Sequence, residues 1–323
     1  MNCSLANAVR ITATSRSDNH FVPGSVGLTT QSVAMVDPQA TYSIGSKLVA
    51  LDSTTSPILN SVLKGMLGSS VNLTLVSYQG LAAATATFGP IWTNLGLGTT
   101  SQILNTQVTV KNFCNATASA LNSQGDPASL TAATVLGTLA GQVDPNAKFT
   151  FGDIMEFATG DPGSAATAKM DILEMVGMAA AAANRKNLLN LTVPITIAGV
   201  TSTTMKMGII EPPVIWSGRP GQTPGAHTAQ VRIQFDSVLS TQLTVLLQQG
   251  TVHLPVYMEG AGANGDLTNV RCAIPSSSSD ITVHTTTQAV TAKVGTATDS
   301  TMNDPTVSAD VRAGQIVSIS GLV

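Results

Sequence analysis

Charge is scarce in this chain. Lys, Arg, Asp and Glu make up 10% of its 323 residues, against about 25% in an average soluble protein. The net charge is −3, and the few basic residues are scattered along the sequence. A nucleic-acid-binding surface and a polybasic lipid anchor both need clustered Lys and Arg. We therefore expect no nucleic-acid partner and no electrostatic attachment to anionic lipid.

Long uncharged apolar runs are missing as well, although the mean hydropathy is +0.25. A membrane-spanning helix needs about 20 mostly apolar residues. The nearest candidate, Met170–Ala183, is shorter and contains Asp171 and Glu174. The first residues, MNCSLANAVRITAT, lack the apolar region of a signal peptide. If the protein is exported, we expect its membrane anchor to lie upstream of Met1 and this chain to be a piece of a longer protein.

Cysteine is rare, and Cys3, Cys114 and Cys272 have no metal-ligand spacing. An odd count leaves one thiol without a partner in the chain. Cys114 and Cys272 are the candidates for a disulfide. The alternative for Cys114, on a predicted helix with no base nearby in sequence, is a small buried apolar side chain.

Ala, Thr and Ser are plentiful instead. A weakly charged surface rich in these residues favours an extracytoplasmic or assembling protein over a cytosolic enzyme. The strongest helix signal is Asp161–Lys186, where Asp161 is a capping residue and Pro162 suits the first helical position. Apolar residues lie nearly all round this stretch, so we predict one buried helix there.

The pattern of elements changes near the middle of the chain. Residues 46–186 read as helices with short strands between them, and residues 188–274 read as β-prone runs broken by prolines. We predict an α+β fold in which an antiparallel sheet built from both chain ends packs against helices from the middle. Residues 1–274 form the main domain. A Ser/Thr-rich β segment at 281–323 is either a small terminal unit or part of that domain.

Two motifs match binding sequences only formally. Asp52-Ser53-Thr54-Thr55-Ser56 resembles the Mg²⁺-binding sequence of von Willebrand A domains, but its third position is Thr and the surrounding chain lacks alternating strands and helices. We expect a turn there, with Ser56 capping a helix. Gly260–Gly265 satisfies G-x-G-x-x-G, but β-like residues follow it where a dinucleotide site needs a helix. We expect a loop or bulged strand.

The histidines and acidic pairs give no site by spacing. The histidines are His20, His227, His253 and His284. None has a second ligand at metal spacing. Asp153 with Glu156 and Asp171 with Glu174 are spaced as on a helix, and such pairs usually lie on solvated faces or in first turns. We therefore predict no catalytic, cofactor-binding or metal-binding residue.

Two alternatives remain open at this point. The first is a binding module with an apolar cavity for a lipid or small hydrophobic ligand, lined by Met175, Met178, Val193 and Ile195. The second is an enzyme that gathers distant groups such as His227, His253 and Glu259 into one cleft. Each alternative requires that its own set of side chains lie around one cavity or cleft.

Many short segments match one family in the same order along the chain. They are Asn7–Ala13, His20–Phe21, Pro38–Leu51, Ser56–Leu63, Leu67–Leu73, Ser77–Ala82, Ile210–Pro213, His227–Arg232, Leu254–Tyr257 and Leu267–Cys272. Together they resemble the later part of TadG-type proteins of the Flp/Tad pilus-assembly system. The resemblance covers most of the chain, and its specificity lies in the order of the matches.

The resemblance implies an envelope protein that is held by one N-terminal hydrophobic helix and projects outside the cytoplasm. It implies a part in building or anchoring a Flp-type fimbria, with other pilus-assembly or envelope proteins as partners. The family offers no catalytic residues to carry over. The anchor and the Ala-rich segment after it are missing here, and no von Willebrand A-like region is found. We expect a non-enzymatic structural protein without a cofactor, on the periplasmic or cell-surface side of the inner membrane, with its oligomeric state open.

Overall fold

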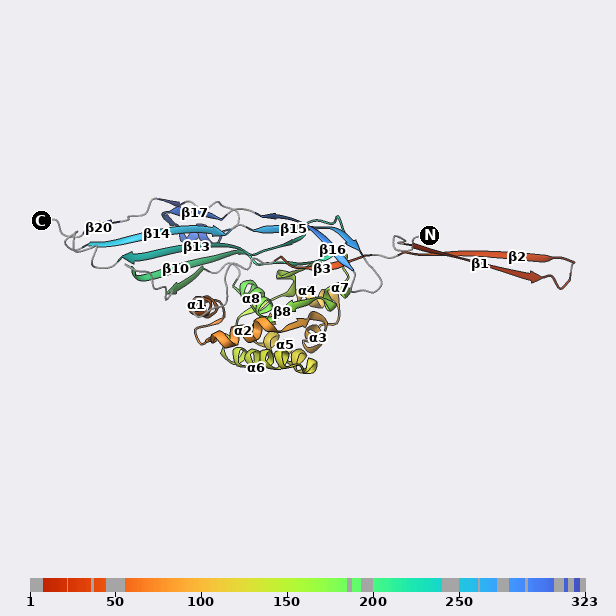
Figure 1. Cartoon of the computed structure of the whole chain (residues 1–323), viewed down its shortest axis with the longest axis horizontal. Coiled ribbons are helices and arrows are strands. Elements are labelled where there is room, and N and C mark those ends of the chain that lie inside the picture. Colours follow the sequence, from red (N-terminus) through yellow and green to blue (C-terminus); the bar gives the residue numbers. More distant parts are fainter. Residues whose placement is uncertain are drawn as a thin grey trace.

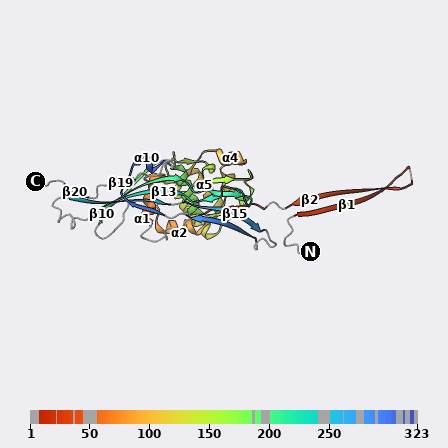
Figure 2. The ribbon, with the colours of Figure 1, turned by 90° about the horizontal axis from the view of Figure 1, so that it is seen from above.

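The structure is a computed structural model of the whole chain (Figure 1). It describes residues 8–21, 23–35, 38–44, 56–184, 188–192, 200–239, 250–260, 262–271, 279–287, 290–304, 311–312 and 317–319. The molecule is elongated, with the helices gathered on one side of a long β layer. Two N-terminal strands project from one end as an arm, and the view from above (Figure 2) shows the same projection.

The helices from the middle of the chain share one apolar core, and a short helix near residue 300 belongs to a separate small cluster. They are α1 (Ser56–Leu67), α2 (Leu75–Ala83), α3 (Phe88–Asn94), α4 (Thr100–Asn105), α5 (Val110–Gln124), α6 (Pro127–Gln142), α7 (Gly163–Thr167), α8 (Ile172–Ala183) and the distant α10 (Asp299–Met302). Asp126 begins α6 by accepting the backbone N–H of Ser129, with Pro127 in the first turn. Leu121 of α5 and Leu136 of α6 are fully buried in this core.

Aromatic rings fill the centre of the helical core. Phe88 stacks on Trp92 with ring centroids 5.8 Å apart, and Phe151 meets the Trp92 ring edge-on at 6.0 Å. Phe113 and Phe149 continue the cluster at 5.5 Å. Although aromatic residues are only 4% of the chain, concentrating them in one place supplies large buried area and favourable edge-on contacts.

The single helix predicted over Asp161–Lys186 is wrong. The stretch forms α7, then the short strand β8 (Lys169–Asp171), then α8. β8 pairs with β4 (Thr85–Thr87), and this pairing holds Met170 opposite Ala86. Asp171 then starts α8 by accepting the backbone N–H groups of Leu173 and Glu174. The strand pairing and this second cap outweigh the helix propensity of the sequence. The expected burial holds for α8, where Met175, Val176 and Ala179 are among the buried residues.

The largest sheet is antiparallel and comes from the later part of the chain. Its order is β17–β14–β13–β10–β9, with β20 also paired to β14. The strands are β9 (Leu188–Thr192), β10 (Val200–Glu211), β13 (Gln230–Leu239), β14 (Gly250–Gly260), β17 (Thr291–Val294) and β20 (Val317–Ile319). Leu189, Leu191 and Met205 form its buried face, against which Val62 and Met66 of α1 pack.

The remaining strands form smaller sheets. They contain β3 (Ala40–Tyr42), β5 (Val108–Thr109), β6 (Lys148–Phe149), β7 (Met155–Phe157), β11 (Ile215–Gly218), β12 (Ala226–His227), β15 (Ala263–Arg271), β16 (Asp280–Thr287), β18 (Thr296–Ala297) and β19 (Val311–Arg312). β11 lies between β3 and β7, antiparallel to the first and parallel to the second. A second sheet has the order β12–β15–β16. The Tyr42 hydroxyl links the two sheets by donating to the Gly265 carbonyl over 2.7 Å.

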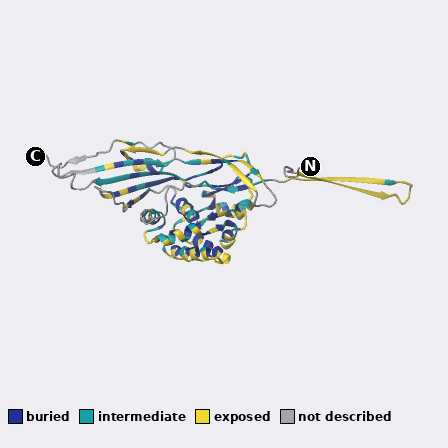
Figure 3. Ribbon diagram, viewed as in Figure 1, coloured by how far each residue is buried: buried dark blue, intermediate teal, exposed yellow. Residues whose placement is uncertain are grey.

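The arm is a hairpin of β1 (Ala8–Asp18) and β2 (Ser25–Met35). The two strands pair without a bulge from Ala8–Met35 to Asp18–Ser25. Gly24, with φ of 135°, helps close the turn, because glycine adopts positive φ without steric cost. Nearly every arm residue is exposed, as Figure 3 shows.

The fold class is therefore α+β, with antiparallel sheets from both chain ends and helices from the middle. The N-terminal part contributes β3 to the body, while β1 and β2 pair with each other. Strands of the terminal segment 281–323 pair with β14, and β16 pairs with β15. Among the described residues, no helix is both long and apolar enough to cross a membrane.

The helical core sets the first expected outcome. Leu136→Ala removes a fully buried side chain and should lower the free energy of unfolding by about 2–5 kcal/mol. Leu130→Ala is the control on the same helix, because Leu130 is 45% exposed, and it should cost less than about 1 kcal/mol. Urea unfolding followed by circular dichroism measures both. Equal losses in the two variants would contradict the assigned core.

Candidate functional site

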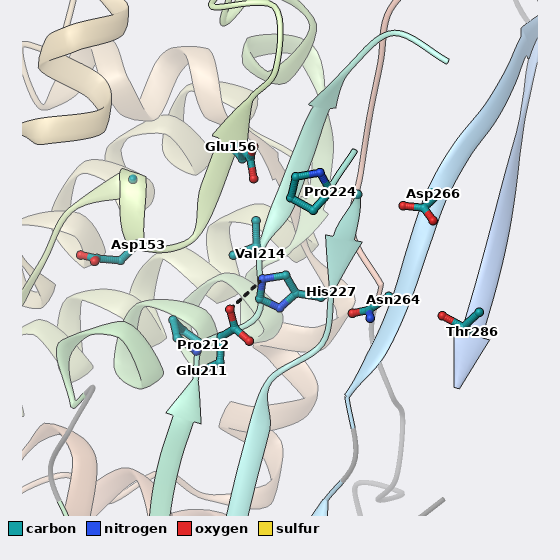
Figure 4. A pocket seen from close by; sticks show the side chains of 12 residues that line it. Asp153, Glu156, Glu211, Pro212, Val214, Pro224, His227, Asn264, Asp266 and Thr286 are labelled. Atoms are coloured by element: carbon teal, nitrogen blue, oxygen red, sulfur yellow. Dashed lines mark ion pairs between the residues drawn. The ribbon is translucent and has the colours of Figure 1, made fainter. Parts of the chain in front are cut away.

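A cleft of about 530 Å³ lies where the helical part meets the β12–β15–β16 sheet. Its lining comes from five places in the chain: the 3-10 turn Phe151–Asp153, β7, the end of β10, β12 and the β15–β16 pair. Figure 4 shows the residues around it. Four carboxylates line this space, on Asp153, Glu156, Glu211 and Asp266.

His227 is the one imidazole in the cleft lining. Its Nε2 atom lies 3.5 Å from Oε1 of Glu211, as the dashed line in Figure 4 marks. The backbone of His227 bridges to Val214, which fixes β12 beside the end of β10. The His227 side chain is 18% exposed and Glu211 is 55% exposed, so solvent screens this pair strongly.

The acidic groups in the cleft differ in their roles. Asp153 closes a turn by accepting both the backbone N–H and the hydroxyl of Thr150 at 2.8 Å. Glu156, on β7, is exposed, and Asp266 lies on β15 across the cleft. With three further carboxylates near Asp153, the cleft is a region of negative potential, because low-dielectric walls focus the field of like charges.

The described residues contain no group of three or more His, Cys, Asp and Glu arranged to hold a metal ion. The four carboxylates of the cleft can attract positively charged groups. The expected helical pair of Asp153 and Glu156 is not formed, because Glu156 lies on a strand. Both carboxylates nevertheless line the same cleft, which the spacing did not predict.

The three groups considered for an enzyme do not share a cleft. His253 contacts Asp236 at 3.2 Å in a separate space of about 280 Å³. Glu259 lies six residues further along β14, about 20 Å away at strand spacing, and pairs with the buried Arg232 at 3.1 Å. Each side chain has its own partner, and only His227 reaches the acidic cleft. His20 in the arm turn and His284 on β16 are exposed.

The Glu259 site has a structural role inside the large sheet. The Arg232 guanidinium also donates to the Asp304 carbonyl at 2.9 Å, so it ties β13 to the chain after α10. Tyr257 donates to Glu259 at 3.1 Å. Burial, followed by the charge of Glu259, raises the pKa of Tyr257 to about 12. A buried ion pair with these hydrogen bonds orders the sheet.

The remaining sequence candidates have structural positions. The glycine motif spans the end of β14, at Gly260, and the start of β15, at Ala263–Gly265, so no helix follows it. Asp52–Thr55 lie outside the described residues, and α1 begins at Ser56. Asp171 caps α8, and Glu174 in its first turn accepts from the Ser43 hydroxyl at 3.4 Å.

Cys114 and two of the residues expected to line an apolar cavity lie in the helical core. Cys114 is a free thiol, fully buried on α5, and Cys272 lies outside the described residues, as does Cys3. Met175 and Met178 pack in the same core. Val193 and Ile195, the other residues expected around a cavity, lie outside the described residues.

The arm presents two different faces. Residues opposite each other in an antiparallel pair point to the same side, and successive residues alternate. One face is uncharged and contains the pairs Val9–Ala34, Ile11–Ser32, Ala13–Thr30, Ser15–Leu28 and Ser17–Val26. Ile11 and Leu28 are 62% and 61% exposed. The other face has Arg10, Arg16 and Asp18, so we call the two the apolar face and the charged face.

Comparison with known protein families gives one match. Residues 56–183, which hold α1 to α8, fit the family model described as a domain of unknown function (DUF8293). The match covers less than half of the chain and is centred on the helical core. No similar curated protein and no similar solved structure was found.

Burial of Cys114 predicts a pH effect. Desolvation raises the pKa of the Cys114 thiol to about 12, whereas a thiol in the unfolded chain ionises near pH ~8.5. The folded state therefore keeps a proton that the unfolded state releases. The protonated thiol therefore makes its full contribution to the free energy of unfolding below pH ~8.5. At higher pH the free energy of unfolding declines, by about 1–2 kcal/mol by pH ~10.

Cys114→Ala should remove this decline of the free energy of unfolding with rising pH, even if the substitution lowers stability at pH 7. Urea unfolding between pH ~8 and ~10 measures it, at pH values below the raised pKa of Tyr257. Cys3 and Cys272 are the same in both proteins and cancel in the comparison. Identical pH slopes for the two proteins would contradict the buried thiol.

Gly225 provides a test of the cleft wall. A Cβ atom added at Gly225 would collide with the Gly265 carbonyl oxygen and come within 2.8 Å of the Tyr42 hydroxyl. Gly225→Ala should therefore destabilise the protein by about 1–3 kcal/mol. Gly262→Ala is the control, because nothing lies within 4 Å of its added Cβ. A thermal shift equal in both variants would show that β12 does not lie against β15.

Proposed function

We propose that the chain is a non-enzymatic structural protein of the bacterial cell envelope that helps to build a Flp-type fimbria and contacts other proteins through its arm. The observation that carries the contact role is the arm itself. It projects from the body in both views and is exposed on both faces (Figures 1 and 2). The segments that resemble TadG-type proteins in the same order along the chain support a place in the cell envelope and a part in fimbria assembly.

The arm's energetics favour a contact role. An isolated two-stranded hairpin is marginally stable in water, because it has no core to cover its apolar side chains. Val9, Ile11, Val26 and Leu28 are between 51% and 62% exposed on the apolar face. Burying one such side chain against a partner contributes about 1.5–3 kcal/mol. An exposed apolar surface rimmed by polar residues is typical of a protein-interaction site.

Genetic complementation in the native host tests this function. The full-length gene with Ile11→Lys and Leu28→Lys should give normal protein levels, because neither side chain packs in the body, but few surface fimbriae. Each Lys removes about 1.5–3 kcal/mol of apolar burial at the contact. Immunoblots measure protein level, and electron microscopy counts fimbriae.

The control variant makes the same chemical change elsewhere. Val76→Lys with Leu130→Lys replaces two side chains that are 71% and 45% exposed on helices, and it should restore fimbriae as the wild type does. Full fimbriation in a strain that lacks the gene would refute the pilus role. Full restoration by the Ile11→Lys and Leu28→Lys variant would refute the arm as the contact element.

A further inference from the structure

The root of the arm and the acidic cleft lie at the same end of the body. β3 follows the arm in sequence, and the hydroxyl of its Tyr42 bonds to Gly265 on β15. The cleft is lined by Asn264 and Asp266 of that strand, and none of its lining residues belongs to the arm. The arm points away from the body (Figure 1). A second copy that approaches this end would therefore bring its own arm alongside the cleft.

An open sheet edge borders the cleft. β16 is the outer strand of the β12–β15–β16 sheet as described, and Thr286 on it lines the cleft. Its eight side chains are exposed except for the intermediate Val283. The outer backbone groups of such an edge strand are a template for pairing with another extended segment. The outer edges of the arm, which pairs only within itself in the described chain, can supply that segment.

The charges of the two surfaces are complementary. The charged face of the arm has Arg10 and Arg16, both exposed. The cleft beside β16 has Glu156, Glu211 and Asp266. Complementary potentials steer two surfaces together and fix their register. An arm lying along β16 with its charged face toward the cleft places opposite charges near each other.

Surface area favours exchange between two copies over a single contact. Each arm strand has 11 residues, so one arm face covers roughly 350 Å² at ~3.4 Å per residue and ~4.8 Å between strands. One arm that used its whole face would bury roughly 700 Å² in total, less than the ~1,200 Å² of a stable specific interface. Two exchanged arms can bury up to roughly 1,400 Å², which lies in the standard range.

We propose that the protein forms a two-fold dimer by exchanging arms, each arm lying along β16 of the other copy with its charged face toward the acidic cleft. The proposal rests on the contact role of the arm and names its occupant, a second copy of this chain. A two-fold arrangement makes both contacts identical, as closed dimers require. It also gives the charged faces of both arms a partner at once.

Charge reversal in the full chain tests the dimer. Sedimentation velocity should show a dimer of the wild-type protein at about 1–100 μM. Arg10→Glu with Arg16→Glu should raise the dissociation constant at least about tenfold in low salt, and less in high salt, because salt screens exposed charges. Glu156→Lys with Asp266→Lys should have the same effect. The variant carrying all four changes should regain the wild-type dissociation constant.

The control variant is Lys111→Glu with Lys148→Glu, which makes the same change in net charge at exposed positions of α5 and β6. It should dimerise as the wild type does. A monomer at every concentration would overturn the proposal. So would a dimer that tolerates the arm reversal, or a four-change variant that fails to recover.

The two proposals can fail separately. A monomer whose Ile11→Lys and Leu28→Lys variant still loses fimbriae would show that the arm docks on a different protein, which refutes the exchange but keeps the envelope role. An arm-dependent dimer in a strain that makes fimbriae without the gene would keep the exchange and refute the role.

Discussion

The position of every candidate surface depends on burial of β11 on both of its sides. All four of its residues are buried. Ile215 belongs to the helical core, while Trp216 packs with Tyr42 and Leu267 in the cluster beneath the β12–β15–β16 sheet. Neighbouring residues of a strand point to opposite faces, so this short strand must have apolar material on each side. The helices and the cleft walls are held together by that requirement.

Polar contacts also hold β11 in register with its two neighbours, β3 and β7. The Thr41 hydroxyl contacts that of Ser217 at 2.8 Å, and the backbone N–H of Ile215 donates to Ile154 at 2.8 Å. Because Ile154 immediately precedes β7 and Thr41 lies in β3, both neighbours of β11 are tied to it. Glu156 on β7 and the strand β3, which follows the arm in sequence, are therefore held in one three-stranded sheet.

The arm follows the same alternation of side chains without this support. Val9, Ile11 and Ala13 alternate with polar residues as Leu189 and Leu191 do in β9, yet β9 is covered by α1 and the arm is covered by nothing in the described chain. Alternation predicts a strand with one apolar face and leaves open what covers that face. The alternation in residues 8–14 can be seen in the sequence, whereas the projection of the arm from the body cannot.

Features that depend on neighbouring residues alone, such as helix caps, can be recognised in the sequence. The capping of α6 by Asp126 and Pro127 needs only neighbouring residues, and the change to strands after residue 188 follows from composition. The break between α7 and α8 needs the pairing of Met170 with Ala86, which lies 84 positions earlier in the chain. The cleft needs Glu156, Glu211 and Asp266 from three separate elements. Long-range pairing of this kind leaves no periodic pattern in one sequence.

Because charged residues are scarce in this chain, the position of each one helps to show what it does. Ser, Thr and Ala are plentiful in the chain, and none of these side chains carries a charge. Arg232 and Glu259 are enclosed in the large sheet, where they order strands and α10. The carboxylates of the cleft are gathered around one opening. On a surface with few other charges, such a cluster dominates the local potential. The proposed contacts of the arm therefore draw on two different terms: its apolar face contributes free energy through burial, and the charges of its other face and of the cleft contribute selectivity.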